Sequence, residues 1–348
     1  MSLLECVNLI KHAIVNLINK LNLLIFTSDK EKFMKGFDEK FSDFPDYILK
    51  ITNEIWENRG LHTLHDYYAP DIVVRTPLGI DFGNQGVINA TMNVLAEFPN
   101  RTLLGEDVIW SGTPETGMLS SHRIITTATH IETGQKLRFR VIADCHAKNN
   151  QIDDEWLIRD QGAIARQMGQ TPKDRAREVI ELQEKAGITK PPFTPDIDQD
   201  GPYLGRGNDN LWGEKYADIL TRLMNAEFSL IPHEYDRCCL GEYPGGVSGI
   251  SHGDVDAFWL GLRSSFPNAE FKIHHQIGRE DKLMSPRAAI RWSLTGKHEG
   301  YGHFGQPTGA EVHIMGACHA EFGPWGLRRE YVMYDEVAIW QQILLAEK

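Results

Sequence analysis

The sequence has few of the features that assign a chemistry directly. Its five cysteines form no CxxC pair, which argues against a disulfide framework and predicts reduced, mostly buried thiols. The formal net charge is −12, so neither a nucleic acid nor an anionic membrane is an expected partner. The sequence contains no nucleophile elbow, P-loop or dinucleotide-binding fingerprint, and we predict no cofactor. We therefore expect a cytoplasmic protein whose partner is a small-molecule substrate or ligand.

Long apolar runs are also missing. Residues 3–26 are rich in apolar side chains at helical spacing, but Lys11, His12 and Lys20 interrupt them. This pattern predicts an amphipathic helix and is too polar for a membrane span. We predict that residues 1–45 form a helical extension that packs on the body, and a surface membrane anchor is the alternative.

What the sequence does contain is a duplication. Positions 168 residues apart match without a gap, and after a seven-residue insertion in the second copy the matches continue 175 residues apart. The matched pairs include His65 with His233, Phe98 with Phe266, Arg123 with Arg291, His130 with His298, Glu155 with Glu330, and Asp160 with Asp335. A repeat of this length predicts complete domains. We expect domain one over 46–169, a linker with one helix over 170–211, and domain two over 212–348.

Each copy begins with helical patterns and continues with strand-like ones. In repeat one, two helices are predicted from Asp46 to Tyr68 with a break near Gly60, and a third over 86–98 ends at Phe-Pro-Asn. β-Rich segments follow at 102–110, 118–131, 136–146 and 155–166, and those of repeat two end with 329–344. The fold class predicted for each domain is α+β, with about three N-terminal helices on a strongly curved antiparallel sheet of four to six strands.

Two motifs resemble those of a known family. The stretch from Gly296 to Gly309 is similar to the GTHxGxFxGxPPTG hairpin of the SnoaL-like polyketide cyclases, and Glu155 to Gly169 is similar to their ExWxxxD…QxG tail. The resemblance covers both repeats, roughly 46–169 and 212–345. It implies two cone-shaped domains of the kind found in nuclear transport factor 2 and ketosteroid isomerase. Such domains often dimerise through their sheets, so we expect an internal pseudo-dimer and leave further homo-oligomerisation open.

The resemblance also implies the catalytic group. In the family, an aspartate on the last strand is the general acid/base and needs no metal or cofactor; Asp160 and Asp335 occupy that position. Strand alternation predicts that each points into its own cavity, on the same face as Trp156 or Tyr331. Apolar neighbours there would raise the pKa of the carboxyl group. The alternative is that each aspartate pairs with an arginine and holds the sheet together.

Histidines and a few neighbours complete the predicted site. His130 and His298 lie at the hairpin, where each could orient a substrate or stabilise the hairpin itself. The residues expected to bind substrate are Trp156, Tyr331, His303, His313, His319 and Arg138. No familiar zinc spacing occurs among these histidines, so no metal is predicted. Alternation along the last strand favours a solvated or interface position for Glu155 and Glu330.

Together these expectations favour a cofactor-independent acid/base enzyme of the cyclase, isomerase or lyase type, acting on a small carbonyl compound in an apolar pocket. A non-catalytic small-molecule binding protein and an epoxide-hydrolase-like hydrolase are the alternatives. We expect repeat two to carry most of the chemistry, because it keeps the complete glycine-rich hairpin and gathers histidines beside Asp335. Repeat one, with Arg138, Arg140 and Asp144 at the equivalent strand, is expected to be degenerate or supportive.

Overall fold

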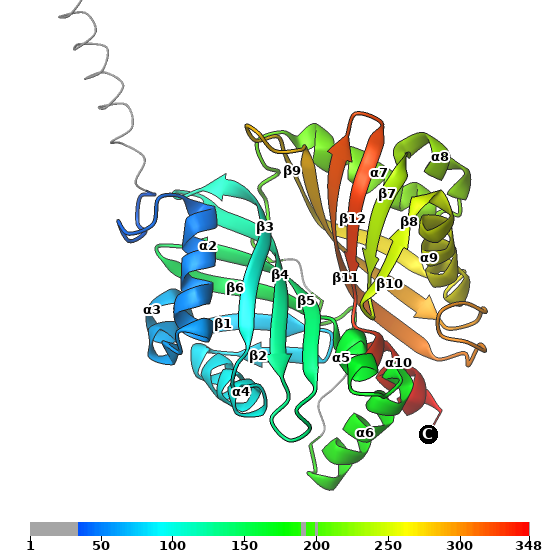
Figure 1. Cartoon of the computed structure of the whole chain (residues 1–348), viewed down its shortest axis with the longest axis horizontal. Helices are drawn as coiled ribbons and strands as arrows, with labels where there is room; N and C mark the ends of the chain where they lie inside the picture. The colour runs from blue at the N-terminus through cyan, green and yellow to red at the C-terminus, as the bar shows by residue number, and fades with distance from the viewer. Residues whose placement is uncertain (1–33, 189–192, 199–200, 348) are drawn as a thin grey trace, which may run out of the picture.

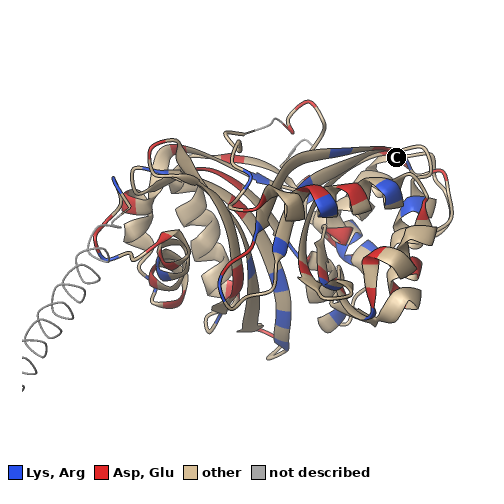
Figure 2. Ribbon diagram, turned by 90° about the horizontal axis from the view of Figure 1, so that it is seen from above, with Lys and Arg blue, Asp and Glu red and all other residues tan. Residues whose placement is uncertain are grey.

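The computed structural model describes residues 34–188, 193–198 and 201–347. Two six-stranded sheets face each other, and each carries helices on its outer side (Figures 1 and 2). This arrangement confirms the predicted α+β class with two tandem domains and an internal pseudo-dimer. Most of the extension predicted over 1–45 lies outside the described residues. Within the described ranges, no helix is long and apolar enough to cross a membrane.

Repeat one begins with the predicted broken helical segment. Its parts are α2 (Phe44–Thr52), a π-helical turn (Asn53–Glu57), a short 3-10 helix (Leu61–Thr63) and α3 (Leu64–Tyr67). Asp43 caps α2 by accepting a hydrogen bond from the Asp46 backbone N–H, and Pro45 lies in the first helical turn, where it fits. The break falls at Gly60, as predicted. The third helix, α4 (Asn84–Glu97), ends at Phe98 directly before Pro99.

The sheet of repeat one has the order β2-β1-β6-β5-β4-β3. Its strands are β1 (Tyr68–Thr76), β2 (Gly79–Phe82), β3 (Thr102–Thr113), β4 (Gly117–Thr129), β5 (Lys136–Lys148) and β6 (Gln151–Arg159). The short β1–β2 hairpin was not predicted. It places β1 beside β6 as a parallel pair, whereas the other neighbours are antiparallel.

Repeat two has the same element order and topology. Its helices are α7 (Asn210–Met224), a 3-10 turn (Phe228–Leu230), α8 (Ile231–Glu234) and α9 (Ser251–Ser265). Its strands are β7 (Tyr235–Tyr243), β8 (Val247–Ile250), β9 (Glu270–Arg279), β10 (Arg287–Lys297), β11 (Glu311–Gly323) and β12 (Gly326–Met333), in the order β8-β7-β12-β11-β10-β9. The linker contributes α6 (Pro172–Lys185), which Thr171 caps.

The last strand of each repeat is shorter than predicted. It ends at Arg159 in repeat one and at Met333 in repeat two, and a helix follows: α5 (Gln161–Gln167) or α10 (Glu336–Ala346). The prediction that strands continue to 166 and 344 is therefore wrong. The physical reason is the aspartate between strand and helix. Asp160 and Asp335 each accept hydrogen bonds from backbone N–H groups in the first helical turn, which starts a helix.

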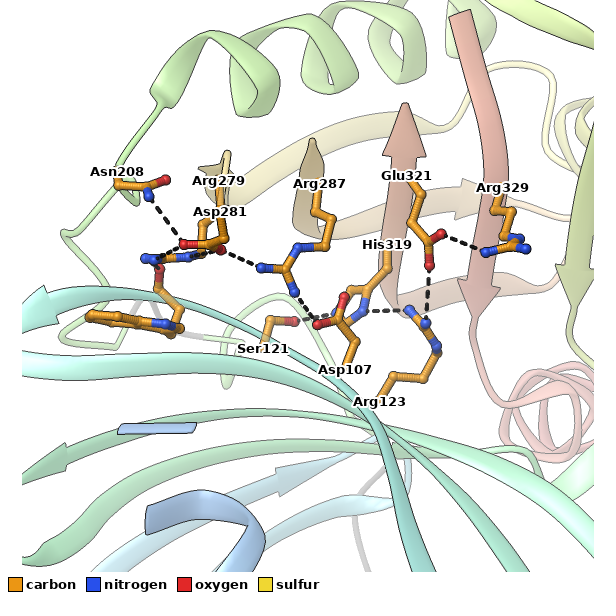
Figure 3. A network of polar contacts seen from close by, with 11 residues as sticks. Asp107, Ser121, Arg123, Asn208, Arg279, Asp281, Arg287, His319, Glu321 and Arg329 are labelled. Carbon is orange, nitrogen blue, oxygen red and sulfur yellow. Dashed lines mark hydrogen bonds and ion pairs between the residues drawn. The ribbon is translucent and has the colours of Figure 1, made fainter. Parts of the chain in front are cut away.

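The two sheets pack through their inner faces. Leu119, Ile142, Trp156, Ile158, Met315, Ala317 and Met333 form a buried apolar cluster between them, together with Phe193 and Tyr203 of the linker. A network of polar contacts also joins the two repeats (Figure 3). Arg287 of repeat two joins Asp107 of repeat one to Asp281. Arg123 of repeat one contacts both Glu106 and Glu321. The predicted sheet-to-sheet contact is thus present.

Candidate functional site

A cavity of about 260 Å³ lies inside repeat one, between its helices and the concave face of its sheet. Its volume is just below the range of about 300–1,000 Å³ that is usual for small-molecule sites. Most of the lining is apolar, with Ile48, Ile51, Trp56, Val74, Val87, Val94, Leu103, Ile124, Val141 and Leu157 among its residues. The polar groups in the lining include Tyr68, Arg101, His122, Glu155, Arg159 and Asp335.

Glu155 is the carboxyl group on the face of β6 that lines the cavity, opposite the face that packs on the other sheet. The prediction of a solvated or interface position is wrong, because Glu155 is buried and lines the cavity. Burial raises the pKa of Glu155 to about 7, and a hydrogen bond with Tyr68 opposes that shift. At neutral pH this carboxyl group can therefore either accept or release a proton, which is the property that general acid/base catalysis needs.

His122 lies on β4, facing the same cavity. The ladder pairs His122 with Ala143 and Ala143 with Leu157, so His122 and β6 are two strands apart, or about 10 Å. Burial lowers the pKa of His122 to about 4, which keeps the ring neutral. Ser120 Oγ lies 3.2 Å from His122 Nδ1. A small molecule between β4 and β6 would thus have a neutral imidazole on one side and a carboxyl group on the other.

Two arginines lie at one end of the cavity. Arg101 follows α4, and Arg159 is the last residue of β6. Burial, and secondly the like charge of Arg159, lower the pKa of Arg101 to about 9. Burial also lowers the pKa of Arg159. Residues 155, 157 and 159 point to the same face of the strand, so Glu155 and Arg159 are about 13 Å apart along β6.

Asp335 reaches the cavity of repeat one from repeat two. Its Oδ1 accepts hydrogen bonds from the backbone N–H groups of Val337 and Ala338. No hydrogen bond to Oδ2 is found among the described residues, and Asp335 lines the cavity. Burial raises the pKa of Asp335 to about 7. The prediction that this aspartate faces the cavity of its own domain is therefore wrong, although the residue does reach a cavity.

Asp160, the equivalent residue, faces the interface. Its oxygens accept hydrogen bonds from the backbone N–H groups of Ala163, Gly245 and Gly246, at 2.8–3.0 Å. Two of these donors belong to the β7–β8 turn of repeat two. Burial raises the pKa of Asp160 to about 6. Asp160 thus joins the two repeats, and the prediction that it points into the cavity of its own domain is wrong.

Among the described residues, Asp335 has no equivalent pair of donors in the other repeat. The repeat-one turn that corresponds to Gly245 and Gly246 begins with Pro77, which has no backbone N–H to donate to Asp335.

Large aromatic side chains fill the corresponding space in repeat two. Trp259, Trp292 and Tyr334 are all fully buried there. The residues at their positions in repeat one are Thr91, Ile124 and Arg159, and all three line the cavity. Glu330, the counterpart of Glu155, accepts hydrogen bonds from Tyr216 Oη, Tyr235 Oη and Trp259 Nε1. Glu330 is therefore enclosed by its own domain.

The hairpin histidines stabilise their hairpins. His298 Nδ1 lies 3.1 Å from Thr308 Oγ1, and His130 Nδ1 lies 3.0 Å from Thr133 Oγ1. His298 also packs against Phe266. Neither histidine lines the cavity of repeat one. The structure therefore agrees with the alternative role that the sequence left open for both.

The residues predicted to bind substrate lie elsewhere as well. Trp156 and Tyr331 are at the interface, where Arg291 stacks on Trp156 and Arg123 on Tyr331. The remaining contacts are those of His319 with Ser121 and Arg123, His313 with Thr295 and Asp198, His303 with Tyr334, and the backbone of Arg138 with Gln167. None of these residues lines the cavity of repeat one. The face of β6 that carries Trp156 packs on the other sheet, and the face that carries Glu155 lines the cavity.

Sequence reasoning missed Arg101, His122 and Arg159. Their counterparts in repeat two are Ala269, Ile290 and Tyr334, so a search for residues kept in both copies passes over them. The signal that could have found them is a difference between the copies: repeat one has three polar residues at positions where repeat two has none of them. Glu155 was noticed because both copies keep it. It was assigned to the wrong face because the prediction took Asp160 to mark the cavity side of the strand.

Comparison with known proteins identifies the family of repeat one. Residues 46–168 match the model of the SnoaL-like polyketide cyclases, which confirms the predicted family for repeat one. Similar solved structures include IdmH from Streptomyces antibioticus, at 21% identity over 36% of this chain and 97% of that chain, with a TM-score of 0.32. A SnoaL-like polyketide cyclase from Agrobacterium tumefaciens is 17% identical over 36% of this chain and 96% of that chain, with a TM-score of 0.30. No curated protein matches the chain significantly in sequence.

Proposed function

We propose that the SnoaL-like domain formed by repeat one is an acid/base enzyme that acts on a small carbonyl compound held in its cavity. The observation that carries this proposal is Glu155, a carboxyl group with a pKa of about 7 on the wall of a mostly apolar cavity. A base of this kind can remove a proton from the carbon next to a carbonyl group and return it at another position. Aldol cyclisation and isomerisation both begin with such a step. In retro-aldol cleavage the base removes the proton of the β-hydroxyl group, the C–C bond breaks, and the enolate that leaves is protonated at carbon.

The neighbours of Glu155 suit that step. Tyr68 donates a hydrogen bond to the carboxyl group and so stabilises its ionised form. His122 is neutral and lines the cavity, and in the tautomer whose Nδ1 accepts from Ser120, Nε2 carries the ring hydrogen. An N–H donor opposite the base would stabilise the oxyanion of an enolate. The apolar walls exclude water, which strengthens both interactions.

Hydrogen exchange at carbon tests the proposal without knowledge of the natural substrate. The protein is incubated in D₂O with a panel of enolisable ketones, and the loss of the α-proton signals is followed by proton NMR. We expect catalysed exchange for members that fit the cavity. Glu155→Gln should lower its rate at least about 100-fold, because a general base typically contributes that much.

Glu330→Gln is the matched control, since it removes the equivalent carboxyl group from the filled domain. It should leave the exchange rate within a factor of two in the folded protein. Exchange that survives Glu155→Gln would contradict the proposal. Ketones that bind in the cavity without any catalysed exchange would favour a non-catalytic binding protein.

A further inference from the structure

The arginines at the end of the cavity differ from the other buried arginines of the protein. Arg75 is paired with Asp154 at 2.7 Å, and Arg287 contacts Asp107 and Asp281. Arg101 and Arg159 have no ion pair within 4 Å among the described residues. The Nε atoms of both are buried without a hydrogen-bond partner, as are those of Arg75 and Arg287, so the missing ion pair is what distinguishes the cavity arginines. The cavity therefore has two guanidinium groups that no carboxylate contacts within the described part of the protein and whose Nε–H donors are unpaired.

Such an arrangement is unfavourable for the protein alone. A buried charge is tolerated when a partner satisfies it, and here each arginine is also close enough to the other to be repelled by it. The charges of Asp335 and Glu97 act on Arg159, but neither carboxylate lies within 4 Å of its guanidinium group. Repeat two has neither cation: Ala269 and Tyr334 are at the equivalent positions, and both are buried.

We propose that the ligand of the cavity carries an anionic group, which Arg101 and Arg159 bind at one end while its carbonyl group lies toward Glu155. A guanidinium group presents N–H donors in a planar fork that matches a carboxylate. The separation of about 13 Å between Arg159 and Glu155 along β6 leaves room for a few carbon atoms between the two functional groups. The substrate class is thus a small keto acid with an apolar body. This inference rests on the proposed function, because it takes the same cavity as the substrate site.

Asp335 gives this site an additional feature. It lines the cavity from repeat two, close enough for its charge to act on Arg159. The anion-binding end of the cavity is therefore built from both repeats. Repeat two contributes a residue to the site of repeat one, while buried aromatic side chains occupy the corresponding positions of its own interior.

A matched pair of probes tests the inference. The binding of 4-oxo-4-phenylbutanoate and of its neutral amide, 4-oxo-4-phenylbutanamide, is measured by calorimetry. We expect the carboxylate to bind at least 10-fold more tightly than the amide. Arg101→Met and Arg159→Met should each weaken carboxylate binding at least 10-fold and bring the two probes closer together in affinity. Methionine keeps the apolar length of the side chain and removes the charge.

Two controls separate binding from folding. Arg177→Met removes an exposed arginine on α6 and should leave the affinity for both probes unchanged. Thermal unfolding is the second readout: Arg101→Met and Arg159→Met should melt at or above the wild-type temperature, because they remove unpaired buried charges. If either arginine stabilised the fold, its methionine variant would melt at a lower temperature than the wild type.

The inference and the proposed function can fail separately. If the two probes bind equally, if neither binds at millimolar concentration, or if the arginine variants keep the preference for the carboxylate, the inference is overturned. Loss of ketone exchange in Glu155→Gln would still support the proposed function in that case. If the carboxylate preference is found but no ketone exchanges, the anion site stands and the catalytic proposal fails.

Discussion

Replacing Glu155 with glutamine should change how the stability of the protein depends on pH. The pKa of Glu155 is raised from 4.5 to about 7, chiefly by burial. Below pH 4.5 this group is protonated in both the folded and the unfolded protein and has no effect. Between pH 4.5 and 7 the unfolded chain releases the proton while the folded protein keeps it. The free energy of unfolding therefore falls as the pH rises through this window.

The magnitude follows from the shift. A shift of one pKa unit corresponds to about 1.4 kcal/mol, so Glu155 should reduce the free energy of unfolding by about 3 kcal/mol between pH 4.5 and 7. Above pH 7, where Glu155 is ionised in both the folded and the unfolded protein, this reduction in the free energy of unfolding no longer changes with pH. Glutamine has no charge to desolvate, so the Glu155→Gln protein should gain about 3 kcal/mol relative to the wild type across the same window. The other buried carboxyl groups titrate in the same way in both proteins, so their contributions cancel when the free energy of unfolding of the wild type is subtracted from that of the variant.

The assay is urea unfolding of both proteins from pH 4.5 to pH 8, followed by tryptophan fluorescence. Glu330→Gln provides the contrast, because burial also raises the pKa of Glu330 to about 7. Trp259 Nε1–H, however, donates to the carboxyl oxygen Oε2, which accepts even when protonated, whereas an amide NH2 group in that place cannot accept, so this variant should be less stable than the wild type at low pH. A constant difference between Glu155→Gln and wild type at every pH would refute the reasoning.

Three further substitutions test other parts of the structure. Asp335→Asn should strengthen binding of 4-oxo-4-phenylbutanoate at pH 8, where the aspartate is mostly ionised beside Arg159, and have little effect at pH 6, where it is mostly protonated; calorimetry at the two pH values measures this. Thr91→Trp copies the filled interior of repeat two and should abolish probe binding while circular dichroism stays unchanged. Arg287→Met should lower the free energy of unfolding by about 3–5 kcal/mol in urea titrations, because the carboxylates it joins across the sheets lose their partner.

Much of the fold could be predicted because its signals are local. The third helix of each repeat ends before a proline, and the long strands are β-branched segments separated by turn residues. The short β1–β2 hairpin was missed because its strand β2 has only four residues. The helices after Arg159 and Met333 were missed because the aspartate before each was interpreted as a strand residue, whereas it acts as an N-cap.

The site could not be located by alternation alone. In a sheet with one face in water, polar residues mark the outer face, but both faces of β6 are buried here. Glu155 faces the cavity, and Trp156 faces the other sheet. The prediction used the aspartate to mark the cavity face, and because Asp160 lies at the interface with repeat two, that choice exchanged the two faces. The presence of Asp335 in a cavity of the other repeat depends on the packing of the domains, which no local pattern encodes.

The duplication has left the two copies with different physical roles. Repeat two replaces Thr91 and Arg159 by Trp259 and Tyr334, which bury large apolar surfaces in place of a cavity. A filled interior is more stable than one with an apolar void, and the lost cation removes a desolvation penalty as well. Repeat one keeps a cavity, unpaired arginines and a carboxyl group with a raised pKa, all of which reduce stability. Since the two sheets share an extensive interface, the stability of repeat two can support the less favourable interior of repeat one, and one folded chain then contains both.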